Sequence, residues 1–358
     1  MENLEIKNLT GFLLPLAVSA GLFYFILRNG GVSQNINLKS KRWGGIILGV
    51  AVIICITLFQ NIFSGFLLPK DYWSLILGII ILLVGGIWDD WEKISWQKQL
   101  LFQSGAAIIA VLAGDTIEHI RLPIPYHDGA GSEGVVLFFP PFIAAIMAYF
   151  WIILVIEALN WLDGVDGLSG SVSFVTLLVL AVLGLTPVVN QPSTTLLCLI
   201  IAGVLLGFLF FNFFPAKVYL GSSGVWILGF LIAVISIYSG GKVATTALVL
   251  GIPIVDFIFV SMERILAGKL PVFGGDRRHL HERLEDQKWN PAKITLAFSA
   301  FSLLLGIGAL LTQTRGKYFL FIPVAAFFVF FAWLLERRPL PTQASLWEGK
   351  PIKRSRKK

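Results

Sequence analysis

Two adjacent aspartates, Asp89 and Asp90, close a long apolar run in the segment GGIWDDWEK. At the end of a helix their charge would oppose the helix macrodipole, and at a membrane boundary carboxylates are costly to desolvate. A solvated helix end is the simpler interpretation. Two crowded carboxylates nevertheless favour a bound cation, and sites rich in oxygen ligands select Mg²⁺. The pair is therefore the first candidate for chemistry.

A second acidic group lies in the segment ALNWLDGVDGLSG. Asn160, Asp163 and Asp166 recur every three residues, so a helix would bring them to one face. Gly164 and Gly167 would let the backbone approach a ligand closely. A single Asp-Gly pair is a common turn. Two such pairs in register with an asparagine, on the same side of the membrane as the first pair, indicate a shared polar site.

A basic loop, GGDRRHLHERLED, contains the cations that such a site would need. Its candidate ligands for an anion are two arginines and two histidines, namely Arg277, Arg278, His279 and His281. The histidines are two residues apart, which does not fit the i, i+4 spacing of helical zinc proteases. A solvated loop that follows the orientation rule of membrane proteins is the plainer alternative.

A fourth polar segment, FNFFPAKVYLGSSG, adds Asn212, Lys217 and Gly221. Carboxylates that hold Mg²⁺ beside lysine and arginine meet the requirement of a nucleotide diphosphate site. The metal neutralises phosphate oxygens and the side-chain cations hold the rest. The four segments together therefore predict chemistry on a phosphorylated substrate.

Long apolar runs must position these segments. The chain has 358 residues, 56% of them hydrophobic and 14% charged, with a mean hydropathy of +0.81. A soluble domain would need more polar residues to cover its surface. About eleven runs meet or approach the ~20 residues of a membrane-spanning helix. We expect an all-α polytopic bundle with spans near 10–27, 44–63, 72–88, 99–114, 138–158, 168–187, 194–213, 223–239, 243–261, 292–312 and 317–335.

The distribution of basic residues predicts the orientation. Most of the 28 lysines and arginines fall on one side if the N-terminus is outside, and basic loops are cytoplasmic. We expect a cytoplasmic C-terminus with a basic tail at 336–358, and all four polar segments on the cytoplasmic face of the inner (plasma) membrane. The whole chain, 1–358, is interpreted as one membrane domain.

Other features predict structure rather than chemistry. The longest outside loop, from Asp115 to about Gly134, contains turn residues between short apolar stretches and predicts a hairpin. Its two histidines, at 119 and 127, have no partner cluster and are expected at the surface. Cys55 and Cys198 lie inside apolar runs, so we expect packing rather than a disulfide or a metal site.

Together these motifs resemble the polyprenyl-phosphate N-acetylhexosamine-1-phosphate transferases, the family that includes phospho-MurNAc-pentapeptide transferase and the bacterial GlcNAc-1-phosphate transferases. The resemblance runs from SKRWGGI at 40–46 to HLHERL at 279–284. It rests on the Asp-Asp pair followed by Lys98 and Gln103, the Asn-x-x-Asp-Gly-x-Asp-Gly-Leu signature at 160–168, Asn212 with Pro-Ala-Lys at 215–217 and Gly221, the Pro-Ile-x-Asp element at 253–256 with Arg264, and the Asp-x-x-His-x-His loop.

The resemblance implies a reaction. In this family the phosphate of a lipid attacks the β-phosphorus of a UDP-sugar, UMP leaves, and Mg²⁺ is needed. For this chain it implies transfer of an N-acetylhexosamine 1-phosphate to a polyprenyl phosphate, such as undecaprenyl phosphate, at the start of cell-envelope glycan assembly. The implied partners are the UDP-sugar, the lipid and the bilayer, with no nucleic acid. Mn²⁺ is an alternative metal. A homodimer is a candidate assembly.

On this basis the candidate catalytic residues are Asp89 and Asp90, and the candidate metal ligands are Asn160, Asp163 and Asp166. The candidate substrate-binding residues are Lys98, Asn212, Lys217, Arg277, Arg278, His279 and His281.

Three positions depart from the family pattern. Ser222 stands where the family has a metal-ligating aspartate, Glu157 replaces the first asparagine of the Asn-rich signature, and Glu282 replaces the second histidine of a His-His pair. A hydroxyl is a poor replacement for a carboxylate on Mg²⁺. The alternative is therefore a non-catalytic relative that binds the lipid or the UDP-sugar. A transporter is disfavoured because the acidic residues lie at one face rather than at the midplane.

Overall fold

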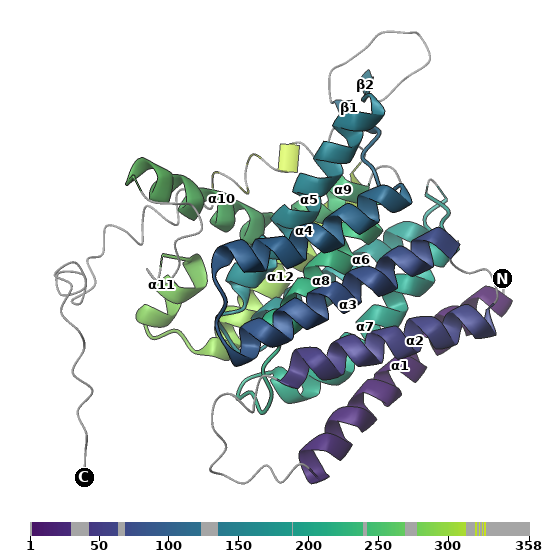
Figure 1. Cartoon of the computed structure of the whole chain (residues 1–358), viewed down its shortest axis with the longest axis horizontal. Coiled ribbons are helices and arrows are strands. Elements are labelled where there is room, and N and C mark those ends of the chain that lie inside the picture. Colours follow the sequence, from purple (N-terminus) through teal and green to yellow (C-terminus); the bar gives the residue numbers. More distant parts are fainter. Residues whose placement is uncertain are drawn as a thin grey trace.

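The computed structural model describes residues 2–29, 43–63, 69–122, 135–187, 189–238, 242–268 and 278–312, together with residues 319, 320, 322, 324 and 326. Most of these residues are helical (Figure 1). The helices are α1 (Glu2–Asn29), α2 (Gly44–Ile62), α3 (Pro69–Trp91), α4 (Trp96–Ala113), α5 (Pro141–Leu162), α6 (Leu168–Leu185), α7 (Pro192–Asn212), α8 (Gly221–Ile237), α9 (Lys242–Val249), α10 (Gly251–Leu266), α11 (Leu280–Asp286) and α12 (Pro291–Leu311).

Local sequence signals fix several helix ends. Pro141, Pro192 and Pro291 stand at the first helical positions of α5, α7 and α12, where the missing N–H costs nothing and the fixed φ suits a helix. Asn290 caps α12, because its side chain accepts a hydrogen bond from the Ala292 N–H. Gly114 ends α4 with φ +102°, a conformation that favours glycine.

The structure confirms a polytopic helical membrane protein. Seven described helices are long and apolar enough to cross a membrane: α1, α2, α3, α5, α6, α7 and α12. The pair α9 and α10 passes the same test as one span bent by 75°, which raises the count to eight. The finer expectation of about eleven spans is not confirmed. Helix α4 and the 17-residue α8 do not pass the test, and the run at 317–335 lies largely outside the described residues. The orientation also stays a prediction.

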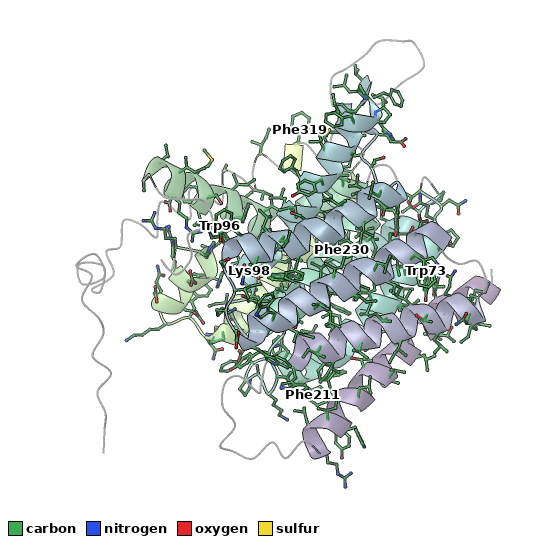
Figure 2. All side chains as sticks on the ribbon, viewed as in Figure 1. Trp73, Trp96, Lys98, Phe211, Phe230 and Phe319 are labelled. Carbon is green, nitrogen blue, oxygen red and sulfur yellow. The ribbon has the colours of Figure 1, made fainter. Side chains whose placement is uncertain are left out.

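Helix α8 occupies the centre of the bundle. Every residue from Ser223 to Ile237 is buried, and α2, α3, α5, α6 and α9 pack around it. Figure 2 shows Phe230 of α8 among side chains inside the bundle. Two neighbouring helices approach the first turn of α8 closely. A Cβ on Gly45 of α2 would lie 2.2 Å from Gly224 N, and one on Gly86 of α3 would lie 2.3 Å from Ser223 Cα. Both contacts therefore require glycine at positions 45 and 86.

A short hairpin marks one end of the bundle, opposite the end where α11 lies (Figure 1). Strands β1 (His119–Leu122) and β2 (Val135–Phe138) pair antiparallel, with His119 opposite Phe138. This confirms the predicted hairpin, and the His119 ring packs against Phe138 with 5.7 Å between ring centroids. The expectation for His127 lies outside the described residues.

Candidate active site

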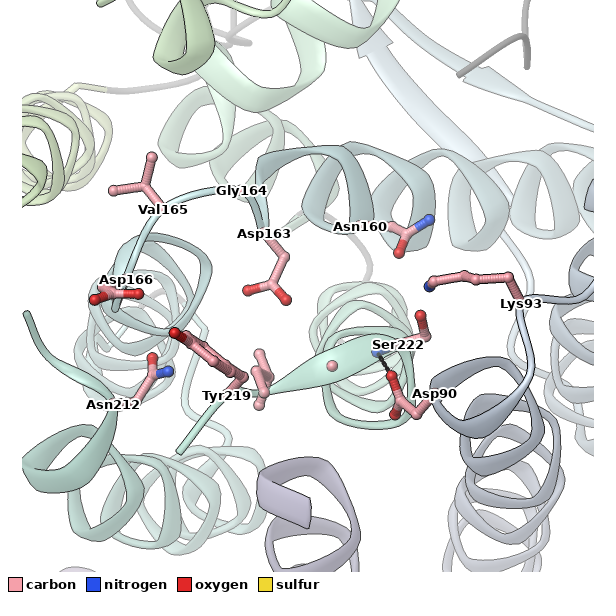
Figure 3. A pocket seen from close by; sticks show the side chains of 12 residues that line it. Asp90, Lys93, Asn160, Asp163, Gly164, Val165, Asp166, Asn212, Tyr219 and Ser222 are labelled. Carbon is pink, nitrogen blue, oxygen red and sulfur yellow. Dashed lines mark hydrogen bonds between the residues drawn. The ribbon is translucent and has the colours of Figure 1, made fainter. Parts of the chain in front are cut away.

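A cavity of about 430 Å³ lies where α3, α5 and α7 end and α8 begins (Figure 3). The polar side chains in its lining are Asp90, Lys93, Asn160, Asp163, Asp166, Asn212, Tyr219 and Ser222. The structure therefore brings together three of the four polar segments singled out in the sequence. The fourth, the histidine loop, packs beside them.

Asp89 is buried and does not line the cavity. Lys93 Nζ donates to its Oδ2 at 2.7 Å, and the Ile94 N–H and Gln99 Nε2 donate to Oδ1 at 3.1 and 3.0 Å. Ser222 Oγ also donates to Oδ2. With four donors from three segments, this carboxylate holds the end of α3, the start of α4 and the start of α8 together.

Asp90 caps the N-terminus of α8 from a neighbouring helix. The N–H groups of Ser222 and Ser223 donate to its two oxygens at 2.9 and 3.1 Å, and Ser223 Oγ donates at 2.7 Å. A carboxylate at a helix N-terminus satisfies N–H groups that lack helical partners and meets the positive end of the helix dipole. Gly221 has φ +68°, and a Cβ there would lie 2.6 Å from Asp90 Oδ1, so this approach requires glycine.

The Asn160, Asp163 and Asp166 group meets at the cavity, but not on one helix. Helix α5 ends at Leu162, so only Asn160 is helical and a tight turn presents the two aspartates. Ser169 Oγ donates to Asp163 Oδ1, and the Ala216 N–H donates to Asp166 Oδ2 at 2.9 Å. Asp163 points into the cavity between the other two residues (Figure 3).

The two residues expected on the following loop have different positions. Asn212 lines the cavity, and its Nδ2 donates to the Val218 carbonyl at 2.8 Å, which fixes the loop after α7. Lys217 is exposed and does not line the cavity.

The histidine loop docks against the cavity wall from outside. His279 Nδ1 lies 2.7 Å from Asp256 Oδ2, and the Leu280 N–H donates to the same carboxylate at 3.0 Å. His281 packs against the turn, since a Cβ on Gly164 would lie 2.4 Å from its Nε2. Arg278 pairs with Glu263 at 3.6 Å, beside the loop. Arg277 lies outside the described residues.

Lysine 93, rather than Lys98, is the cation of the cavity. Lys98 is exposed at the start of α4 (Figure 2), and its Nζ lies 4.6 Å from the ring centroid of Trp88. Lys93 lines the cavity, and sequence reasoning missed it. Its spacing of four residues from Asp89 was the available signal, because such residues are neighbours on a helix surface. Tyr219 was also missed, and a lone tyrosine in an apolar loop gives no signal.

The cavity can accept a divalent cation only if a ligand completes its coordination. The described residues contain no group of three or more His, Cys, Asp or Glu side chains placed to hold a metal. Mg²⁺, however, is commonly bound by one or two carboxylates together with water and substrate phosphates. Asp163, with oxygens of Asn160 and Asp166 nearby in the lining, fits that mode of binding.

Comparison with known proteins agrees with this geometry. The family model described as glycosyl transferase family 4 matches residues 72–240. Over these residues the chain is similar to glycosyl transferase family 4. The matched segment contains every residue that lines the cavity, from Asp90 to Ser222.

Individual proteins also match the chain, two of them over most of its length. A protein of Bacillus subtilis, named a probable undecaprenyl-phosphate N-acetylglucosaminyl 1-phosphate transferase, is 25% identical over 79% of this chain and 78% of its own. The phospho-N-acetylmuramoyl-pentapeptide-transferase of Lactiplantibacillus plantarum is 28% identical over 84% of this chain and 95% of its own. An undecaprenyl-phosphate alpha-N-acetylglucosaminyl 1-phosphate transferase of Thermotoga maritima is 31% identical over 37% of this chain and 45% of its own.

Proposed function

We propose that the protein transfers an N-acetylhexosamine 1-phosphate from a UDP-sugar to a membrane polyprenyl phosphate and releases UMP. The main support is the acidic cavity with Lys93 in its lining. The cavity lies at the ends of membrane helices, and its lining residues fall inside the segment matched by the family. Relatives named for this class of reaction extend over most of the chain. The names of the relatives give no support to the alternative of a non-catalytic binder.

In the proposed reaction an oxygen of the lipid phosphate forms a bond to the β-phosphorus of the UDP-sugar. The bond from that phosphorus to the oxygen bridging the two phosphates breaks, and UMP leaves with the bridging oxygen and its electron pair. The sugar remains on a polyprenyl diphosphate. A phosphate monoester has a second pKa of about 6, so the lipid phosphate is largely dianionic at neutral pH. It can therefore attack without a carboxylate that removes a proton.

This chemistry gives Asp89 and Asp90 positioning roles. Asp89 holds the ammonium of Lys93 at 2.7 Å, beside the cavity where phosphate oxygens would bind. Asp90 holds the first turn of α8, and with it Ser222, at the edge of the same cavity. Neither role consumes a proton.

The proposed metal is Mg²⁺, with Mn²⁺ as the alternative. Asp163, Asn160 and Asp166 would hold it, and phosphate and water would complete its ligands. When bound, it would neutralise charge on the diphosphate of the donor. The proposal also places the cavity on the cytoplasmic side of the plasma membrane, which rests on the bias of lysine and arginine in the loops.

A direct assay tests the proposal. The purified protein in detergent is supplied with undecaprenyl phosphate, Mg²⁺ and separate UDP-N-acetylhexosamines, and both UMP and the lipid-linked sugar are measured. We expect equal amounts of the two products with at least one donor, and no product without the lipid phosphate. Absence of UMP with every donor, from protein that still binds UDP-sugar, would instead support the non-catalytic relative.

A further inference from the structure

Glu157 lies directly behind the cavity wall, on α5 one turn before Asn160. Its carboxylate accepts a hydrogen bond from Nε2 of Gln103 at 2.6 Å. It is also hydrogen-bonded to the side chains of Asn160 and Trp161. Gln103 is buried on α4, so Glu157 connects two helices and two residues of the signature segment.

The hydrogen bond between Glu157 and Asn160 determines which way the Asn160 amide faces. A carboxylate oxygen accepts hydrogen bonds and an amide donates them through its nitrogen, so Asn160 presents its Nδ2 to Glu157. Its Oδ1 is then turned away from Glu157. Figure 3 shows the amide nitrogen of Asn160 directed away from Asp163 and Ser222, with the oxygen on their side. The wall at Asn160 therefore presents an acceptor to the cavity.

The same carboxylate supports the wall beyond Asn160. The Trp161 ring lies 4.5 Å from the guanidinium carbon of Arg264 and 4.9 Å from the centroid of the His279 ring. Arg264 is buried on α10, and His279 is the N-cap residue of α11. A hydrogen bond that fixes Trp161 therefore also fixes the surface on which the histidine loop rests.

The charge of Glu157 matters because position 222 is neutral. Ser222 contributes a hydroxyl, which it donates to Asp89. Of the two additional glutamates in the signature motifs, Glu282 uses its Oε2 to cap the His279 N–H at 3.3 Å. Glu157 is close enough to Asp89 for the two charges to interact. Of these two glutamates, Glu157 is therefore the one whose carboxylate acts on the acidic residues at the cavity.

We propose that Glu157 is a positioning residue that turns the amide oxygen of Asn160 into the cavity and makes the α5 wall a cation-binding surface although residue 222 is a serine. The diphosphate that would share this cation rests on the proposed function, whereas the binding of the cation itself does not. Residues that orient a metal ligand typically change metal affinity by about 10–100-fold. Replacing Glu157 should therefore weaken the binding of a divalent cation by at least about tenfold.

Mn²⁺ binding to the purified full-length protein provides a test that needs no turnover. Free Mn²⁺ is titrated against wild type and Glu157→Gln, and the signal of the unbound ion is followed by electron paramagnetic resonance. We expect about tenfold weaker binding in Glu157→Gln, because the neutral amide leaves the Asn160 amide free to turn its nitrogen inward. Glu118→Gln is the matched control, since it removes the same charge from an exposed site near the hairpin. Equal affinity in wild type and Glu157→Gln would overturn the proposal.

A rescue variant separates positioning from general damage. In the Glu157→Gln background, Asn160→Asp presents an oxygen to the cavity whichever way the side chain turns, so Mn²⁺ affinity should return to within a few-fold of wild type. Failure of that rescue in a folded protein would contradict the proposal.

The single substitution Asn160→Asp gives an independent result if Glu157→Gln does not fold. It sets a carboxylate against Glu157, so we expect a lower melting temperature than wild type. An unchanged melting temperature with unchanged Mn²⁺ affinity would count against the proposal. A wild-type protein that binds Mn²⁺ in this manner but never releases UMP would refute the proposed function alone.

Discussion

The Nζ of Lys93 lies 2.7 Å from Oδ2 of Asp89, four residues earlier, across the end of α3. The two side chains differ greatly in burial, with 63% of the lysine side chain exposed and 1% of the aspartate. A buried carboxylate that has three other donors thus holds a cation whose end reaches the cavity. The pair therefore fixes a positive charge at the place where the substrate's phosphates are expected.

Replacing Lys93 by alanine should lower UMP release by at least about tenfold, since a hydrogen bond to a charged group contributes roughly 1.5–3 kcal/mol. Lys98→Ala is the matched comparison on the next helix. Because Lys98 is exposed and packs on Trp88, its loss should change the rate by less than about threefold. Initial rates of both variants check this, and equal losses would contradict the distinction between the two lysines.

Asp163→Asn should reduce turnover by more than about tenfold, because it removes the carboxylate that points into the cavity and would neutralise a bound cation. The change is nearly isosteric and the amide can still accept from Ser169, so the melting temperature should stay close to that of wild type. Turnover and thermal unfolding are measured on the same preparation. A wild-type rate would exclude Asp163 from the reaction.

Asp90→Ala should act mainly on stability. It leaves the Ser222 and Ser223 N–H groups without their cap, which typically costs about 0.5–2 kcal/mol. We therefore expect a larger fall in melting temperature than for Asp163→Asn. Thermal unfolding of the two variants side by side decides this, and an unchanged melting temperature for Asp90→Ala would show that the cap is dispensable.

Ser222→Asp should make the protein more dependent on a divalent cation. The new carboxylate would lie beside Asp89 and Asp90. It would replace the hydroxyl that donates a hydrogen bond to Asp89 with a like charge that repels it. Without metal, the variant should melt below wild type. With Mg²⁺ it should gain more stability than wild type, and half-maximal UMP release should need less Mg²⁺. Identical Mg²⁺ titration curves for the two proteins would exclude position 222 from the metal's surroundings.

Hydrophobic runs predicted most of the helices, but not how deeply each is buried. The run at 223–239 has the same composition as its neighbours, yet α8 lies wholly inside the bundle. Hydropathy cannot distinguish a lipid-facing helix from one surrounded by protein, because both are apolar. The bend between α9 and α10 also fell within a run predicted as one span. Gly251 and Pro253, the first and third residues of α10, were the local signs of a break.

At the site, residue types were predicted better than roles. Asp163 and Asn212 line the cavity as expected, whereas the buried Asp89 and the exposed Lys217 do not. Whether a polar side chain faces a ligand or a neighbouring helix depends on contacts between distant segments, such as Asp90 with the first turn of α8. Spacing along the chain records only local neighbours, so it could not show that the aspartate pair would join α3 to α8.

The central position of α8 has a consequence for the response to the bilayer. A membrane protein adapts to a change in hydrocarbon thickness mainly by tilting its lipid-exposed helices. Helix α8 is buried from Ser223 to Ile237, so such a change can reach its first turn only through the surrounding helices. Gly45 and Gly86 hold that turn against backbone contacts, where little sliding is tolerated. Thick and thin bilayers should therefore alter the outer helices while leaving the distance between Asp90 and α8 nearly constant.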